Sequence, residues 1–426
     1  MEFSKYKLKD LTVNGKGEYG IGASAVEYSP DLYKYLRITD IDDNGFINSN
    51  HMKSINDKNE ECYLLKTNDI VFARTGNSTG KSYFYNSDDG PLVYAGFLIK
   101  FSLDPTKLNP KYLRYYTLTN EYKGWVNQFS IGSTRKNINA KIFGDMVISL
   151  PPRYYQDFVV DILDSLENKV KINKQIIANL EELSQTLFKR WFVDFEFPDK
   201  DGNPYKSSGG KMIDSELGKI PSNWKIYKLK DIASHKKETF NPKKSEEVTV
   251  KHFSLPAYDN EEQAIEEEVN KIKSNKWIIN NNCVLFSKMN PNTKRIWLPV
   301  IDNKKLNVAS SEFVVMESPN NKINSFIYNI CLNSQFIDYL KANTTGSTNS
   351  RQRVKPTIAV NYKLAVEDSI VKKYSEIITP YMEEMKTLRS EIGKLTQLRD
   401  TLLPKLMSGE LEIPDDVEVN TDELSI

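Results

Sequence analysis

Two short glycine-containing segments carry residue types that could bind phosphate or read DNA bases. Gly132-Ser-Thr-Arg-Lys-Asn137 and Gly346-Ser-Thr-Asn-Ser-Arg-Gln-Arg-Val-Lys355 each place hydroxyl side chains beside arginine or lysine. Hydroxyls, backbone N–H groups and guanidinium groups donate to phosphate oxygens, and an arginine fork can also bind guanine bidentately. The alternative is a plain glycine turn in which serine or threonine caps a helix. Because the pattern occurs twice, we favour a shared DNA ligand.

A third segment, Gly76-Asn-Ser-Thr-Gly-Lys-Ser82, looks like a nucleotide-binding loop but lacks its spacing. The phosphate-binding loop needs four residues between its glycines, so that the backbone N–H groups can wrap the phosphates. Only three residues separate the glycines here, and Thr75 stands where the first glycine would have to be. We interpret the stretch from Arg74 to Lys81 as a basic loop after a strand, suited to phosphates or base edges. An ordinary surface hairpin is the alternative.

The candidate DNA contacts share a polar or basic side chain and a position in one of these loops or in the related segment at 288–295. They are Arg74, Asn77, Lys81, Ser133, Thr134, Arg135, Lys136, Lys288, Lys294, Arg295, Ser347, Thr348, Arg351, Arg353 and Lys355.

Catalytic residue patterns are scarce in the chain. Its three histidines lie far apart, and neither GxSxG nor HExxH occurs. Acidic residues at 40–43 and 261–268 are typical of solvated loops rather than of a metal cluster. Leu150-Pro-Pro-Arg153 lacks the amide or carboxylate that precedes the prolines of a nucleic-acid methyltransferase motif. We therefore expect a non-catalytic chain that binds no cofactor or metal of its own.

Length and composition indicate an ordinary soluble protein of several domains. The chain has 426 residues, 39% of them apolar and 27% charged, with a formal net charge of +1. From Glu410 onward the tail has seven acidic residues and no lysine or arginine, which predicts disorder there and leaves about +8 on the rest. No apolar run approaches the roughly 20 residues of a membrane span. Three dispersed cysteines are typical of reduced thiols, so a cytoplasmic location is expected.

A regular apolar stripe predicts a long helix over residues 156–192, and the pattern returns over residues 374–402. The stripes occupy heptad a and d positions, so the two helices are expected to pair as an antiparallel coiled coil. Polar stripe positions Asn173, Ser184 and Arg399 could fix the register, and Pro380 should kink the second helix or mark its start. The expected pairing residues are Leu163, Leu166, Val170, Ile177, Leu180, Leu187, Ile378, Met385, Leu388, Ile392, Leu395 and Leu402.

Six segments recur at an offset of about 214–221 residues, which indicates an internal duplication of a whole module. One example is Asn68-Asp-Ile-Val-Phe-Ala-Arg74, which matches Asn282-Cys-Val-Leu-Phe-Ser-Lys288. Short β-rich runs alternate with helix and turn residues in each copy, so the predicted fold is mixed α+β with a pseudo-two-fold repeat. The strands are expected at 70–73, 92–101, 146–150, 284–287, 309–316 and 362–366. The expected boundaries are 1–153 and 224–371 for the modules, 154–192 and 372–408 for the long helices, 193–223 for a linker, and 409–426 for the tail.

A series of further motifs follows in a fixed order along the chain. They are Gly132-Ser-Thr before Asn137-Ile138, Ile148-Ser-Leu-Pro-Pro152 before Gln156, Leu187-Phe-Lys-Arg-Trp-Phe-Val-Asp-Phe195, Gly218-Lys-Ile-Pro-Ser-Asn-Trp224, and Leu402-Leu-Pro-Lys-Leu-Met-Ser-Gly409. In this order they resemble the DNA-specificity subunit of type I restriction–modification systems, over nearly the whole chain. The second copy departs from the first where Glu367-Asp-Ser replaces Pro151-Pro-Arg.

The resemblance implies two α/β target-recognition domains, separated by two long helices and each reading one half of a bipartite double-stranded DNA site. It also implies that the helices carry two modification subunits, which bind S-adenosylmethionine and methylate adenine. Two ATP-dependent restriction subunits would join for cleavage, so S-adenosylmethionine, ATP and Mg²⁺ are expected on partners and no membrane is involved. Two other functions stay open: a coiled-coil scaffold that binds proteins, and an enzyme with an unrecognised phosphate loop or metal site.

Overall fold

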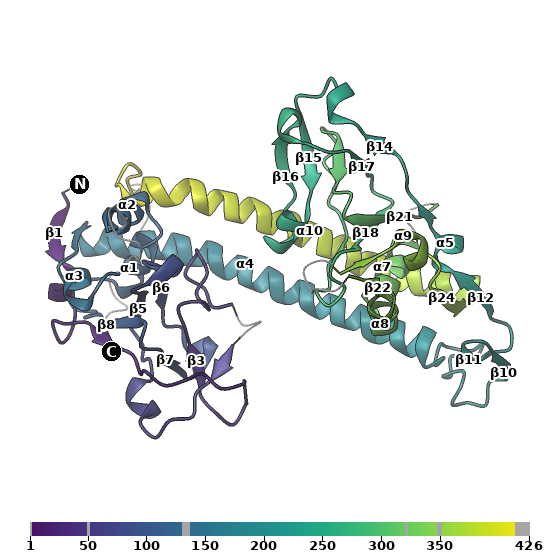
Figure 1. Cartoon of the computed structure of the whole chain (residues 1–426), viewed down its shortest axis with the longest axis horizontal. Coiled ribbons are helices and arrows are strands. Elements are labelled where there is room, and N and C mark those ends of the chain that lie inside the picture. The colour runs from purple at the N-terminus through teal and green to yellow at the C-terminus, as the bar shows by residue number, and fades with distance from the viewer. Residues whose placement is uncertain (1, 49–51, 130–136, 320–322, 347–351, 414–426) are drawn as a thin grey trace. The chain divides into compact units, whose positions relative to one another are not determined.

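The computed structural model describes residues 2–48, 52–129, 137–319, 323–346 and 352–413 (Figure 1). The chain divides into two compact units. Unit 1 comprises Met1–Asn168 and Thr396–Ile426, and unit 2 comprises Lys169–Leu395. Both division points fall inside long helices, so each unit contains a globular part and a segment of both helices.

The globular part of unit 1 is built from short strands and helices. Its strands are β1 (Ser4–Lys7), β2 (Glu18–Tyr19), β3 (Lys34–Leu36), β4 (Lys53–Ser54), β5 (Asp69–Ala73), β6 (Ser82–Phe84), β7 (Leu92–Tyr94), β8 (Leu98–Ser102) and β9 (Val147–Leu150). Its short helices are α1 (Pro110–Tyr116), α2 (Asn120–Gln128) and α3 (Ala140–Gly144). The strands form one sheet of order β2-β8-β5-β6, a second of order β4-β3-β7, and the pair β1-β9.

Strand β5 is central to unit 1 because both of its faces are buried. Ile70 and Phe72 belong to the apolar cluster that contains residues of α1, α2 and α3, whereas Val71 and Ala73 belong to a second cluster. Alternate side chains of a strand point to opposite faces, so a continuous apolar run predicts burial on both sides. The strand expected at 70–73 is therefore confirmed.

The strand expected over residues 92–101 is wrong as a single element. It is divided into β7 and β8 by a turn in which the Leu98 backbone N–H donates to the Ala95 carbonyl at 2.8 Å. The two halves then pair differently, since β7 runs parallel to β3 and β8 antiparallel to β5. The strand expected at 309–316 is divided in the same manner, into β20 and β21.

Unit 2 has a similar inventory with additional strands. These are β10 (Met212–Ser215), β11 (Gly218–Pro221), β12 (Lys225–Lys228), β13 (Ser234–His235), β14 (Thr239–Phe240), β15 (Thr249–Phe253), β16 (Ile265–Glu268), β17 (Lys276–Ile278), β18 (Cys283–Ser287), β19 (Ile296–Trp297), β20 (Asn307–Ala309), β21 (Phe313–Glu317), β22 (Thr344–Thr345), β23 (Arg353–Val354) and β24 (Lys363–Val366). The short helices are α5 (Leu229–Ile232), α6 (Leu255–Asp259), α7 (Asn324–Leu332), α8 (Ser334–Ala342) and α9 (Pro356–Ala359).

The sheets of unit 2 resemble those of unit 1, except that its second sheet has five strands instead of three. Its main sheet has the order β13-β21-β18-β19, a second has the order β14-β17-β20-β15-β16, and β12 pairs with β24. Strand β15 runs parallel to β20, as β3 does to β7. Strand β18 has two buried faces, with Val284 and Phe286 in one apolar cluster and Cys283 and Leu285 in another.

The long helices are α4 (Arg153–Phe188), which continues into a π-helical turn over Lys189–Val193, and α10 (Asp368–Met407). Inside unit 1, Tyr155 and Leu163 of α4 share a buried cluster with Leu406 of α10. The Tyr155 hydroxyl donates to the Leu406 carbonyl at 3.1 Å. Inside unit 2, the fully buried Asn173 donates from Nδ2 to Glu391 Oε2 at 2.8 Å.

The residues expected to pair the two helices lie away from solvent, since each of the twelve is buried or half-buried. Pro380 lies within α10, which begins at Asp368, so the expectation that the proline marks the helix start is wrong. Proline removes one N–H donor, and a helix held by packing along its length tolerates that loss. Tyr374, Ile378 and Met385 supply such packing, because all three are fully buried in the core of unit 2.

The segment expected to be a linker at 193–223 is packed rather than extended. Phe197 stacks on Trp224 with ring centroids 4.9 Å apart and on Tyr205 at 4.7 Å. The segment also forms the β10-β11 hairpin. Its proline and glycine residues predicted turns. These turns pack onto the core because the aromatic side chains of the segment are buried there.

The first residues of the acidic tail, 410–413, pack against unit 1. The Tyr155 hydroxyl donates to the Leu411 carbonyl at 2.5 Å, and Leu411 and Ile413 pack against the unit 1 core. Disorder from Glu410 onward is therefore wrong for residues 410–413, because two apolar side chains among the acidic ones have a core to contact.

Candidate nucleic-acid interface

Arg74 follows the last residue of β5 and is held by both its backbone and its side chain. Its N–H donates to the Phe97 carbonyl at 3.0 Å, and its carbonyl accepts from the Ile138 N–H at 2.9 Å. Its guanidinium lies 4.8 Å from the ring centroid of Tyr19, and Nε donates to Asn137 Oδ1 at 3.4 Å. The half-buried side chain is thus placed beside the end of the segment that contains Gly132-Ser-Thr.

Unit 2 repeats this backbone arrangement at Lys288, which follows β18. The Lys288 N–H donates to the Glu312 carbonyl at 3.0 Å, and the Lys288 carbonyl accepts from the Val354 N–H at 2.9 Å. A third bond matches as well, since Ala73 donates to the Lys81 carbonyl at 2.8 Å and Ser287 to the Arg295 carbonyl at 2.9 Å. We call these three matching backbone hydrogen bonds the frame. In each unit the frame places the basic residue after the central strand next to a residue at the end of the Gly-Ser-Thr segment or just after it.

Several candidate residues are already engaged in internal contacts. Lys81 Nζ lies 2.8 Å from Asp43 Oδ1. Arg295 binds both carboxylate oxygens of Asp259, at 2.7 and 2.9 Å. Lys288 Nζ donates to the Ser311 carbonyl at 2.7 Å. These three side chains brace loops, and a DNA contact would have to compete with the bonds they already make.

Three candidates are more accessible. Asn77, Lys294 and Lys355 are exposed, and in the part of the chain that the structure describes neither lysine forms an ion pair. Arg353 is exposed and lies 3.8 Å from Glu312 Oε1. The remaining candidates lie outside the described residues: Ser133, Thr134, Arg135, Lys136, Ser347, Thr348 and Arg351.

Tyr19 was absent from the sequence-based candidates although it contacts Arg74. Its hydroxyl accepts a hydrogen bond from the Ala140 N–H at 3.1 Å, and its backbone pairs with Ile99 of β8. No motif surrounds Tyr19, and only the pairing of β2 with β8 brings it to the end of β5. Asn137 did lie within a quoted motif, so position in the Gly-Ser-Thr segment could have identified it.

The opposite end of β5 is fixed by Asp69, which is 2% exposed. Burial raises the pKa of the Asp69 carboxyl, because a charge in a protein interior loses its hydration. Hydrogen bonds from Ser102 Oγ at 2.6 Å and from the Lys66 N–H at 2.8 Å oppose this shift. The carboxylate thus anchors the strand that presents Arg74.

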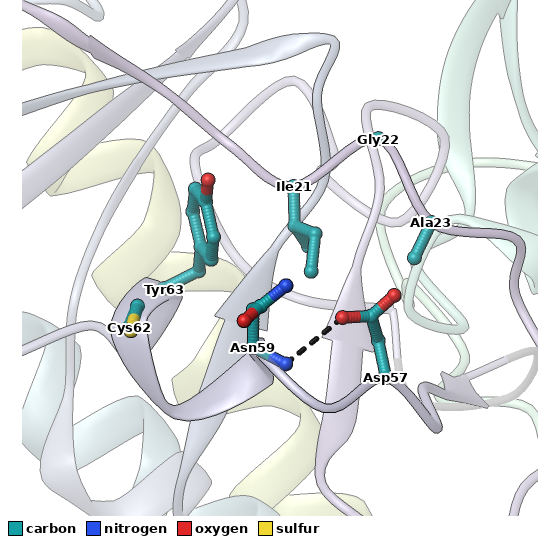
Figure 2. Close-up of a pocket in the computed structure, with 7 residues that line it drawn as sticks. All are labelled: Ile21, Gly22, Ala23, Asp57, Asn59, Cys62 and Tyr63. Atoms are coloured by element: carbon teal, nitrogen blue, oxygen red, sulfur yellow. Dashed lines mark hydrogen bonds between the residues drawn. The ribbon is translucent and has the colours of Figure 1, made fainter.

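A cavity of about 460 Å³ in unit 1 is lined by Ile21, Gly22, Ala23, Asp57, Asn59, Cys62 and Tyr63 (Figure 2). Asp57 Oδ1 accepts a hydrogen bond from the Asn59 N–H at 2.9 Å, and the Cys62 thiol is free and exposed. The lining has one carboxylate and one thiol but no histidine or lysine that could act as a general base. We assign the cavity no catalytic role.

The described residues contain neither a candidate metal centre nor a helix that could span a membrane. No group of three or more histidine, cysteine, aspartate or glutamate side chains there is placed to hold a metal ion. Among the same residues, no helix combines the length and apolar character needed to cross a bilayer.

Known proteins that resemble this chain are specificity proteins of type I restriction systems. Residues 2–182 match the family model described as the type I restriction modification DNA specificity domain. The MjaIX type I restriction enzyme specificity subunit of Methanocaldococcus jannaschii is 26% identical over 313 residues, which cover 72% of this chain and 70% of that protein. The HindI specificity subunit of Haemophilus influenzae is 26% identical over 205 residues, which are 46% of this chain and 42% of that protein.

A solved structure agrees with these matches at the level of the fold. The crystal structure of a type I restriction–modification S subunit from M. genitalium superposes with a TM-score of 0.54 at 15% identity, over 98% of this chain and 97% of that one. The family model and the relatives give the same sequence similarity, and the solved structure supports the fold. Over residues 2–182 and across most of its length, the chain is thus similar to DNA-specificity subunits of type I restriction–modification systems.

Proposed function

We propose that this chain is the non-catalytic subunit that gives a type I restriction–modification complex its DNA sequence specificity. Units 1 and 2 each supply one α/β target-recognition domain, and each domain binds one half of a bipartite site. The two domains descend from an internal duplication. Modification subunits supply S-adenosylmethionine chemistry, and restriction subunits supply ATP- and Mg²⁺-dependent cleavage. The complex acts in the cytoplasm.

The observation that carries this proposal is the repeated frame around Arg74 and Lys288. Each basic residue ends a buried central strand and accepts a backbone hydrogen bond from Ile138 or Val354. Ile138 follows the first Gly-Ser-Thr segment, and Val354 lies near the end of the second. The hydroxyl and guanidinium groups of both segments suit phosphates and base edges. A purely structural turn would need neither the basic residue nor its repetition.

The long helices supply the second part of the proposal, a spacer that pairs as a coiled coil and docks the modification subunits. On α4, the apolar residues Ile172, Ile176 and Leu183 are 49%, 38% and 56% exposed. Their spacing of four and seven places them on one face of the helix. Three exposed apolar side chains in one row are typical of a surface that another protein covers.

The main test is DNA binding by the purified chain together with its modification subunits. We expect selection from randomised DNA to yield two defined half-sites separated by a fixed spacer. Affinity should fall steeply with salt, because phosphate contacts release counterions. A chain that binds no DNA in a sequence-dependent way would instead be a protein-binding scaffold. Methyl transfer by this chain alone would contradict its non-catalytic role.

The docking surface is tested by Ile172→Glu, which places a charge in the exposed row. We expect this variant to lose co-purification with the modification subunit while keeping its circular dichroism spectrum. Ala178→Glu is the matched control, because Ala178 is exposed on the same helix but away from the row. Equal loss of co-purification in both variants would indicate a general effect of charge on α4.

A further inference from the structure

Arg74 differs from the other arginines in how its charge is compensated. Among the described arginines, seven lie within 4 Å of a carboxylate oxygen: Arg37, Arg114, Arg153, Arg295, Arg353, Arg389 and Arg399. Arg74 and Arg190 form no such ion pair within the described ranges, and Arg190 is exposed on the π-helical turn. Arg74 is therefore the half-buried arginine whose guanidinium has no carboxylate partner among the described residues.

The side chain of Arg74 is also fixed in orientation. The guanidinium carbon lies over the Tyr19 ring, 4.8 Å from its centroid, and Nε donates to Asn137 Oδ1 at 3.4 Å. The two terminal nitrogens, Nη1 and Nη2, make no hydrogen bond to the described residues. A planar fork held in this way loses little conformational entropy when it binds a planar acceptor pair.

Tyr19 and Asn137, which contact the guanidinium of Arg74, are themselves fixed by hydrogen bonds to other segments. The Tyr19 hydroxyl accepts a hydrogen bond at 3.1 Å from the N–H of Ala140, the first residue of helix α3. Asn137 forms a backbone bridge with Thr75, the neighbour of Arg74. The ring and the amide thus come from segments of the chain more than a hundred residues apart, both fixed by backbone hydrogen bonds.

We propose that Arg74 reads a guanine in the half-site bound by unit 1, and that Tyr19 is the residue that positions it. This inference rests on the proposed function. The O6 and N7 atoms of guanine form a pair of acceptors in the major groove that matches two guanidinium nitrogens. A phosphate contact would need only a positive charge, without a stacked and oriented plane.

Unit 2 has no arginine at the position equivalent to Arg74. Lys288 occupies the position of Arg74, and its Nζ already donates to the Ser311 carbonyl. A lysine carries a point charge rather than a fork, so it cannot make the same bidentate contact. The two domains share a frame but present different chemistry at it, as two different half-sites require.

The test compares binding profiles of the chain with its modification subunits, for the wild type and five variants. Affinity is measured for every single-base change in the site selected by the wild type. We expect Arg74→Ala to flatten discrimination at one G·C pair by about ten- to a hundredfold and to leave the other positions unchanged. Arg74→Lys should keep the salt dependence of binding but also lose that discrimination.

Variants of Tyr19 separate positioning from folding. Tyr19→Phe keeps the ring and should retain the wild-type profile, whereas Tyr19→Leu should weaken discrimination at the same G·C pair as Arg74→Ala. Lys123→Ala, on an exposed lysine of α2, controls for loss of one positive charge in unit 1. Melting temperatures of all variants show whether each still folds.

Three results would overturn the inference. A uniform loss of affinity in Arg74→Ala that Arg74→Lys restores would identify a phosphate contact. An unchanged profile in Arg74→Ala would mean that Arg74 touches no base. Loss of discrimination at a base other than guanine would refute the assigned acceptor pair. A wild type with no sequence preference would instead refute the proposed function itself, so the two failures are distinguishable.

Discussion

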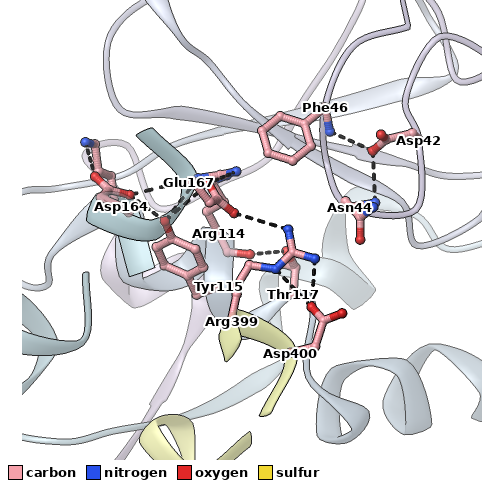
Figure 3. Close-up of polar contacts among 11 residues, drawn as sticks. Asp42, Asn44, Phe46, Arg114, Tyr115, Thr117, Asp164, Glu167, Arg399 and Asp400 are labelled. Carbon is pink, nitrogen blue, oxygen red and sulfur yellow. Dashed lines mark hydrogen bonds and ion pairs between the residues drawn. The ribbon is translucent and has the colours of Figure 1, made fainter. Parts of the chain in front are cut away.

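Arg114 of α1 and Arg399 of α10 approach the same carboxylate, that of Glu167 in α4 (Figure 3). Arg114 Nη2 lies 2.6 Å from Glu167 Oε2, and Arg399 Nη1 lies 4.0 Å from Glu167 Oε1. All three side chains are at most 14% exposed. Phe46 covers Arg114 from the other side, with its ring centroid 4.9 Å away. One carboxylate thus joins the globular part of unit 1 to both of its helix segments.

Glu167→Gln should therefore destabilise unit 1. The amide keeps the shape of the side chain but removes the negative charge that two mostly buried arginines share. Arg399 keeps Asp400 at 2.7 Å and Arg114 keeps Asp164 at 4.0 Å, so the loss should be well below the roughly 3–5 kcal/mol of a broken fully buried pair. Thermal and urea unfolding measure the change. Glu27→Gln is the control, because Glu27 pairs with Lys53 on the surface and is 90% exposed. If both variants unfolded at the same midpoint as the wild type, Glu167 would have no clamping role.

Gly80 should tolerate alanine less well than Gly76, although both have positive φ values of 89° and 75°. A Cβ on Gly80 would lie 2.5 Å from Val126 Cγ1 of α2, whereas a Cβ on Gly76 meets nothing within 4 Å. Overpacking adds about 1–3 kcal/mol to the backbone strain that both variants share. Unfolding midpoints of Gly80→Ala and Gly76→Ala give the comparison. Equal midpoints would show that α2 moves away at no cost.

Unit 2 should lose stability as the pH falls below about 6.5, in part through His252. Burial lowers the pKa of His252 from its ordinary value of 6.5, although Glu267, 2.5 Å from Nδ1, acts in the opposite direction. In the pH range between the folded pKa and 6.5, the unfolded chain binds more protons than the folded chain. Stability therefore rises with pH across that range.

His252→Gln isolates this contribution because the replacement has no charge to gain. We expect its unfolding midpoint to depend less on pH between about 5 and 7 than that of the wild type. The rest of the pH dependence, from other titrating groups, should be common to both proteins. A variant whose pH dependence matched the wild type would mean that His252 is protonated equally in both states.

The proposed spacer role of the helices predicts the effect of lengthening them. One heptad inserted after Asn168 and another after Leu395 would leave the contacts inside each unit unchanged, because the chain divides at these points. Seven helical residues add about 10 Å, which corresponds to about three base pairs. Methylated adenines mapped in DNA from cells with the complete system should then lie about three base pairs further apart. An insertion in α4 alone is the control, since it breaks the pairing register.

Patterns that depend on neighbours in sequence were readable without a structure. The run from Ile70 to Ala73 predicted a strand, and the apolar heptads predicted two long helices. Residues at these spacings share a face whatever surrounds them, because the helix and the strand have fixed periods. The repeat of short segments was visible for the same reason.

The pairing of side chains across loops was decided only by the tertiary structure. Lys81 and Arg295 looked like free DNA contacts, yet Asp43 and Asp259 bind them. Tyr19 was not a candidate at all until strand β2 brought it against Arg74. Ion pairs and stacking depend on which loops close next to each other, and residue spacing carries no information about that. The sequence by itself therefore determined the family resemblance, the helices and the basic segments. The packing of distant segments decided which arginine has its side chain fixed without a carboxylate partner.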